Sequence, residues 1–94
     1  MRLIGKEILE TFSAQHADAR RNISTWVAEV EHTRWRTSTD IKNKYPRASL
    51  LADNVVVFDI NGNKYRIATK VSYEPGVVLV TKAGAHSEYN SWKL

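Results

Sequence analysis

The stretch from Val55 to Tyr73, VVVFDINGNKYRIATKVSY, decides the fold of this 94-residue chain. Residues 55–60 are rich in β-branched side chains, which favour strands. The Asn-Gly-Asn sequence at 61–63 is typical of a turn, because glycine and asparagine adopt positive φ at low cost. Residues 64–73 then alternate between apolar and polar side chains, which is the period of a strand with one buried face. The stretch therefore predicts two strands joined by a tight turn.

Two further strands are expected on either side of this stretch. The Glu-Pro-Gly sequence at 74–76 is a second turn signal, and the apolar run 77–81 follows it. This run shows no alternation, so we expect a strand that is buried on both faces. Near the start of the chain, residues 2–4 predict a short opening strand.

The first half of the chain has helical periodicity. Apolar residues at one-turn spacing predict a helix over 6–16, and Asp18 is a suitable N-cap for a second helix. That second helix carries an amphipathic stripe formed by Ala19, Ile23, Trp26, Val27 and Val30. Thr37 and Asp40 resemble a capping box and predict a short third helix over 38–45, which Pro46 limits.

These elements predict a single α+β domain over residues 1–94. Its expected architecture is a small antiparallel sheet with the N-terminal helices packed on one face, in the order β-α-α-(α)-β-β-β. Trp26 lies on the helical stripe and is expected in the core. Trp35, between two arginines, would either be buried or stack on a base, and we favour burial.

Composition excludes several classes of protein. The chain has no cysteine, which excludes disulfide scaffolds and thiolate zinc sites. The apolar run 55–58 is far too short for a membrane span, and residues 1–10 do not resemble a signal peptide. We therefore expect a cytoplasmic protein that does not bind membranes.

The net charge of +4 is concentrated in two basic zones. One lies within residues 34–47 and the other within residues 60–94, with an acidic gap between them. A basic zone can be an ordinary solvated surface, but two zones facing the same way would favour the phosphate backbone of a nucleic acid. The candidate RNA-binding residues are Lys70, Lys82, Arg34, Arg36, Lys42 and Lys44.

The candidate catalytic residues combine a basic strand with the tail that follows the last strand. Lys64 and Arg66 share a strand face with Lys70, and the tail supplies His86 and Tyr89. RNA can be cleaved without a metal ion when the 2′-hydroxyl attacks the adjacent phosphate, provided that a base, an acid and a cation assist.

In such a reaction His86 would act as general acid or base, because its ordinary pKa lies near neutrality. Arg66 would hold the phosphate with its planar fork, and Lys64 would add charge or shift the pKa of a neighbour. Tyr89 would either stack on a base or share in proton transfer. No second cluster of histidines and carboxylates predicts a metal site, no cofactor motif is present, and no G-x-S-x-G nucleophile elbow occurs.

Two motifs carry a resemblance to a known family. FDINGNKYR at 58–66 and HSEYN at 86–90, within the stretch 55–92, resemble the HigB-type toxins of bacterial type II toxin–antitoxin systems, in the RelE-like superfamily. The resemblance extends more loosely to nearly all of the chain. Ala85 departs from the threonine that commonly precedes the histidine, and Asn90 from the usual aspartate. If that aspartate orients the histidine, catalysis here would be weak.

The resemblance implies a RelE-like fold and an endoribonuclease, or mRNA interferase, that cleaves messenger RNA on the translating ribosome. It also implies a cognate HigA-like antitoxin with a helix-turn-helix DNA-binding domain. Lys64, Arg66, His86 and Tyr89 fall on the family's basic strand and C-terminal motif. Two other functions remain open from the residues: a non-catalytic module that binds RNA or the ribosome, and an interaction protein whose basic face meets an acidic partner.

Overall fold

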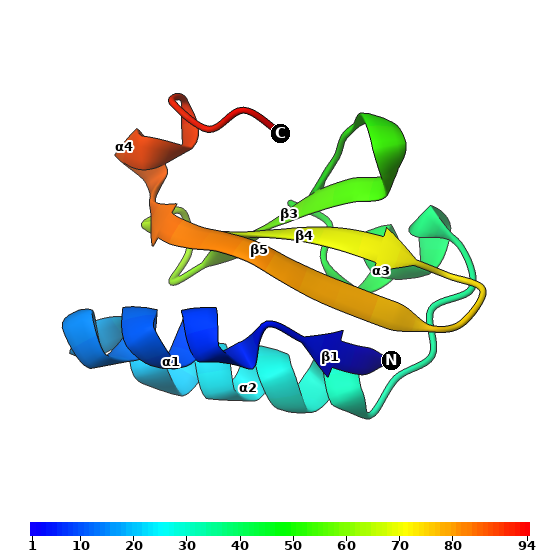
Figure 1. Cartoon of the computed structure of the whole chain (residues 1–94), viewed down its shortest axis with the longest axis horizontal. Helices are drawn as coiled ribbons and strands as arrows, with labels where there is room; N and C mark the ends of the chain where they lie inside the picture. Colours follow the sequence, from blue (N-terminus) through cyan, green and yellow to red (C-terminus); the bar gives the residue numbers. More distant parts are fainter.

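The computed structural model describes all 94 residues and has an α+β fold (Figure 1). The strands are β1 (Arg2–Ile4), β2 (Ser49–Leu50), β3 (Val55–Ile60), β4 (Tyr65–Ser72) and β5 (Val77–Ala85). The helices are α1 (Lys6–Gln15), α2 (Arg20–Glu31), α3 (Ser38–Lys44) and α4 (His86–Tyr89), with 3₁₀ turns at Ala17–Ala19 and Ala52–Asn54. None of these helices is long and apolar enough to cross a membrane.

The five strands form one sheet in the order β1-β5-β4-β3-β2. Helices α1 and α2 cover one face, below the sheet in Figure 1, whereas α4 and the C-terminal tail lie above it. The α+β class and the N-terminal helices on one face are confirmed. The sheet is mixed rather than purely antiparallel, because β1 pairs parallel with β5. Parallel pairing needs a long crossover connection, and the whole chain between β1 and β5 provides it.

The core lies between the helices and the sheet. Trp26 from α2 and Trp35 from the α2–α3 segment are 1% and 3% exposed, and both rings contact Phe58 of β3. Burial of both tryptophans is therefore confirmed. Of the predicted α2 stripe, only Val27 is not fully buried.

Strand β5 corrects one prediction about burial. Val78 and Val80 are buried on the helix side, whereas Leu79 between them is 39% exposed. The run is therefore not buried on both faces, because no helix covers the other side of the sheet at Leu79. Strand β5 also continues to Ala85, beyond the predicted end at residue 81.

The predicted helix starts have different outcomes. Helix α3 begins after Thr37, as expected, and the Asp40 carboxylate accepts hydrogen bonds from the backbone N–H groups of Arg36 and Thr37. Asp18 is not the N-cap of α2, because it lies inside the 3₁₀ turn that leads into the helix. Its carboxylate instead accepts a hydrogen bond from the Tyr65 hydroxyl at 2.8 Å.

Candidate active site

The pairing of β4 with β5 brings together two sequence motifs that are twenty residues apart. Arg66 of β4 lies opposite Gly84 of β5, and Tyr65 lies opposite Ala85. Helix α4 begins directly after β5, at His86, whose backbone N–H donates a hydrogen bond to the Lys64 carbonyl at 2.9 Å. The start of α4 is thereby fixed beside Arg66.

The Arg66 guanidinium connects the members of a compact group. Its Nε donates to His86 Nδ1 at 3.0 Å, one terminal nitrogen donates to Asn63 Oδ1 at 3.2 Å, and the other lies 3.2 Å from Asp59 Oδ1. The guanidinium carbon also lies 4.6 Å from the centre of the Tyr89 ring. We call these five residues the Arg66 cluster. The Arg66 and Asp59 side chains are only 12% and 13% exposed, so the cluster holds the guanidinium in one orientation.

This geometry determines which atoms are free for chemistry. Each terminal nitrogen of Arg66 carries two N–H groups, so one on each nitrogen is left to bind an anion. Since the guanidinium always keeps its protons, His86 Nδ1 is the acceptor in the bond to Arg66. The neutral imidazole in this arrangement therefore carries its proton on Nε2. Protonation at Nδ1 requires that the Arg66 Nε–H first turn away.

Helix α4 is seated on the sheet through Gly84. A Cβ added at Gly84 would lie 2.9 Å from the Trp92 ring and 3.2 Å from the Glu88 carboxylate. Glu88 also accepts a hydrogen bond from the Ala85 N–H at 3.1 Å, and the Trp92 ring packs edge-on against Tyr89. A glycine at 84 therefore lets the C-terminal segment approach β5 closely.

Lys64 contacts a different group of residues. Its side chain leaves the turn before β4 and forms an ion pair with Asp18, with a Nζ–Oδ2 distance of 2.6 Å. This bond and the Tyr65 hydroxyl lower the pKa of Asp18, and the same bond raises the pKa of Lys64. We predicted that Lys64 and Arg66 share one face of the strand. Their charged groups do not lie on one face, because Asp18 binds the Lys64 ammonium.

The other predicted cations of the sheet lie on the face opposite α1 and α2, which we call the open face because only α4 and the C-terminal tail lie over it. Lys70 shares this face with Arg66 along β4, and Lys82 lies opposite Ala68 on β5. Both lysine side chains are exposed. The open face therefore carries basic groups that extend from the Arg66 cluster along two neighbouring strands.

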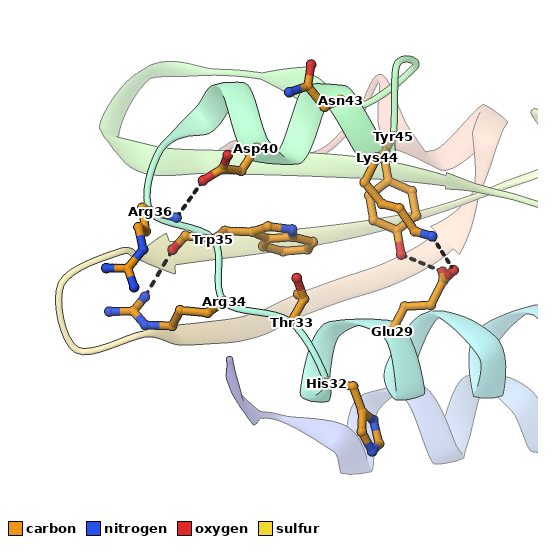
Figure 2. Close-up of a pocket in the computed structure, with 10 residues that line it drawn as sticks. All are labelled: Glu29, His32, Thr33, Arg34, Trp35, Arg36, Asp40, Asn43, Lys44 and Tyr45. Carbon is orange, nitrogen blue, oxygen red and sulfur yellow. Dashed lines mark hydrogen bonds and ion pairs between the residues drawn. The ribbon is translucent and has the colours of Figure 1, made fainter.

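The basic zone within residues 34–47, called the second basic zone below, borders a cavity of about 700 Å³ between α2 and α3, which Arg34, Arg36 and Lys44 line (Figure 2). Three of its four predicted cations are bound within the protein. Arg34 donates to the Tyr73 carbonyl at 2.6 Å, Lys42 donates to the Ala48 carbonyl at 2.7 Å, and Lys44 pairs with Glu29 at 3.0 Å.

Arg36 lines the same cavity, and its side chain is exposed. Glu29 also accepts a hydrogen bond from Tyr45 at 2.6 Å. This bond and Lys44 lower the pKa of Glu29, while burial and Glu29 raise the pKa of Tyr45. The cavity includes no member of the Arg66 cluster.

A family model described as HigB_toxin, the RelE-like toxic component of a toxin-antitoxin system, matches residues 19–92. The chain belongs to the HigB toxin family. The match spans the whole Arg66 cluster and confirms the resemblance seen in the two motifs. A search of curated proteins found no match. Membership in the HigB family implies that an antitoxin is a partner of the chain.

Three residues of the candidate site were not predicted from the sequence: Asp59, Asn63 and Gly84. A signal existed for Asp59, because folding the predicted hairpin about residues 61–64 sets this carboxylate opposite Arg66. Asn63 could be read only as a turn residue. The role of Gly84 depends on Trp92, whose position follows from α4 and not from any local pattern.

Proposed function

We propose that this HigB-family toxin is an endoribonuclease that cleaves messenger RNA on the translating ribosome, without a metal ion, by attack of the 2′-hydroxyl. The observation that carries the proposal is the contact between Arg66 and His86 at 3.0 Å, with Tyr89 beneath the guanidinium. A guanidinium beside an imidazole and a phenol can supply the cation, the acid and the base that this reaction requires. Family membership supports the same assignment.

In the proposed reaction the 2′-oxygen bonds to phosphorus and loses its proton to a base. The bond from phosphorus to the 5′-oxygen breaks, and an acid protonates that oxygen. The products are a 2′,3′-cyclic phosphate and a 5′-hydroxyl. The titratable groups of the Arg66 cluster besides Arg66 itself are His86, Tyr89 and Asp59, and Asp59 is paired with Arg66. His86 and Tyr89 are therefore the proposed proton carriers.

Substrate binding would change the role of His86. A phosphate oxygen that takes the Arg66 Nε–H displaces His86 Nδ1, which is then free to bind a proton. The resulting imidazolium donates a proton to the leaving 5′-oxygen, Tyr89 takes the proton of the attacking 2′-hydroxyl, and Arg66 stabilises the additional charge on the phosphoryl group. Lys70 and Lys82 hold neighbouring phosphates on the open face, and Lys64, once released from Asp18, adds a further positive charge.

The proposed setting is the cytoplasm, where messenger RNA and ribosomes occur, with neutralisation by a HigA-like helix-turn-helix antitoxin. The second basic zone, with Arg36 exposed and Arg34, Lys42 and Lys44 nearby, is proposed as a further contact to RNA.

Induced expression in a bacterial host tests the proposal. We expect growth arrest together with new messenger-RNA ends, and we expect Arg66→Ala and His86→Ala to abolish both. Arg20→Ala is the matched control, because Arg20 is exposed on α2 and belongs neither to the Arg66 cluster nor to the second basic zone. Toxicity retained in both cluster variants would remove these residues from the chemistry. Growth arrest without new RNA ends would favour the non-catalytic RNA-binding module.

A further inference from the structure

Asp18 ties the turn beside the active site to the helical layer. Its carboxylate binds Lys64 Nζ at 2.6 Å and the Tyr65 hydroxyl at 2.8 Å, and its backbone carbonyl accepts a hydrogen bond from Asn61 at 2.8 Å. The side chain of Asn61 also contacts that of Asn22 on α2. Four contacts thus hold the 61–64 turn and the adjoining Tyr65 against the start of α2.

The backbone of Lys64 belongs to the candidate active site, but its ammonium group does not reach it. The Lys64 carbonyl accepts the His86 N–H at 2.9 Å, and Arg66 follows two residues later. The ammonium points instead toward Asp18. The side chains of Lys64 and Asp18 are 62% and 47% exposed, so water screens their attraction. Exposed ion pairs of this kind contribute little stability and are easily exchanged for another anion.

We infer that Asp18 is a positioning residue that restrains Lys64, and that a phosphate of RNA bound at the Arg66 cluster competes with the Asp18 carboxylate for the Lys64 ammonium. This inference rests on the proposed function, because it names an RNA phosphate as the competitor. The exchange needs only rotation of the flexible lysine side chain, since the His86 hydrogen bond holds the Lys64 backbone in place. Asp18 thereby weakens RNA binding while it anchors the turn.

Asp18→Asn separates these two effects. The amide oxygen of asparagine can still accept the Tyr65 hydrogen bond, and the backbone bond to Asn61 is unchanged, but the charge that holds Lys64 is removed. Glu31→Gln is the matched control. It also removes one negative charge, and it breaks an exposed ion pair elsewhere on the helical layer, in which Lys6 Nζ lies 2.7 Å from Glu31 Oε2. The probe is a single-stranded RNA with 2′-O-methyl groups, which cannot be cleaved by 2′-hydroxyl attack.

One phosphate contact on a single strand steepens the dependence of log K on log salt concentration by about 0.7, which is the largest gain expected for Asp18→Asn. At 0.1 M salt this corresponds to binding that is up to about fivefold tighter for Asp18→Asn than for Glu31→Gln. Adding Lys64→Met to Asp18→Asn should remove the gain. Equal affinities and salt slopes for Asp18→Asn and Glu31→Gln would overturn the inference.

A second comparison covers the case in which Asp18→Asn does not fold, as judged by circular dichroism. Lys64→Met alone should weaken binding of the same RNA and lower its salt slope by the part of about 0.7 that the restrained wild-type lysine already contributes, whereas Lys6→Met should not. Equal effects of these two substitutions would again overturn the inference. The proposed function is tested separately. If the wild type produces no new RNA ends in cells, the nuclease assignment fails. A gain in RNA affinity in Asp18→Asn that depends on Lys64 would still support the inference that Asp18 restrains Lys64.

Discussion

Replacing Gly84 by alanine should displace α4 from the candidate active site while the sheet stays intact. The new Cβ would lie 2.9 Å from Cζ2 of Trp92 and 3.2 Å from the Glu88 carboxylate. Nonbonded carbon atoms prefer separations of about 3.5–4.0 Å, so the Trp92 ring must retreat by roughly 0.6–1.1 Å. Because Trp92 packs against Tyr89, and Glu88 caps the start of α4, the shift passes to the groups around Arg66.

The effects on activity and stability should differ greatly. A misplacement of about 1 Å can reduce catalysis about 100-fold, equivalent to about 2.7 kcal/mol in the activation free energy. Stability should change much less, because the contact that is lost belongs to a short helix at the surface. The loss of one hydrogen bond such as that between Glu88 and Ala85 costs about 1 kcal/mol, which lowers Tm by about 4–8 °C in a domain of this size.

The assay compares single-turnover RNA cleavage with thermal unfolding for the wild type, Gly84→Ala, Trp92→Ala and the double variant. If the Trp92 ring is the obstruction, Gly84→Ala should cost little additional activity once Trp92 is alanine. Full activity in Gly84→Ala, at an unchanged Tm, would refute the reasoning that close seating of α4 on β5 aligns the site.

Three further predictions concern single side chains. Arg66→Lys keeps the charge but loses the planar fork that meets His86, and cleavage should fall by at least about 100-fold with RNA binding largely retained. Tyr89→Phe keeps the ring beneath Arg66, so RNA binding should be unchanged. If the hydroxyl carries a proton, the rate of cleavage should fall by about 10² or more. An unchanged cleavage rate would mean that Tyr89 only stacks. The pKa of Glu29 is lowered from 4.5, so its stabilising effect is present above pH 4.5 and is lost as pH falls through the folded-state pKa. Urea unfolding at several pH values should therefore show a shallower acid loss of stability in Glu29→Gln, and identical pH profiles would contradict this.

Local patterns predicted the elements that local chemistry stabilises. The β-branched run gave the bounds of β3, Val55–Ile60, and the Thr37–Asp40 pair gave the start of α3. The stretch 82–85 contains no β-branched residue, and its strand conformation comes from pairing with Tyr65–Ala68 of β4. The parallel pairing of β1 with β5 likewise depends on how the whole chain is arranged, which periodicity does not encode.

The same distinction applies to the candidate site. The two motifs predicted that Arg66 and His86 act together, and their side chains are in contact. The direction of the Lys64 side chain could not be predicted, because it depends on Asp18, which lies 46 residues earlier and resembled a helix cap. Leu79 is exposed for a similar reason: its environment depends on which face of the sheet the helices cover, and the residues of the strand do not specify this.

The chemistry of the new RNA ends tests the central claim most directly. Purified toxin is added to ribosomes that are translating a defined message, and the 3′ end of the upstream fragment is identified by mass spectrometry. Attack of the 2′-hydroxyl at the Arg66 cluster predicts a 2′,3′-cyclic phosphate with the wild type and no fragment with His86→Ala. A 3′-hydroxyl end, or equal cleavage by His86→Ala, would contradict the account.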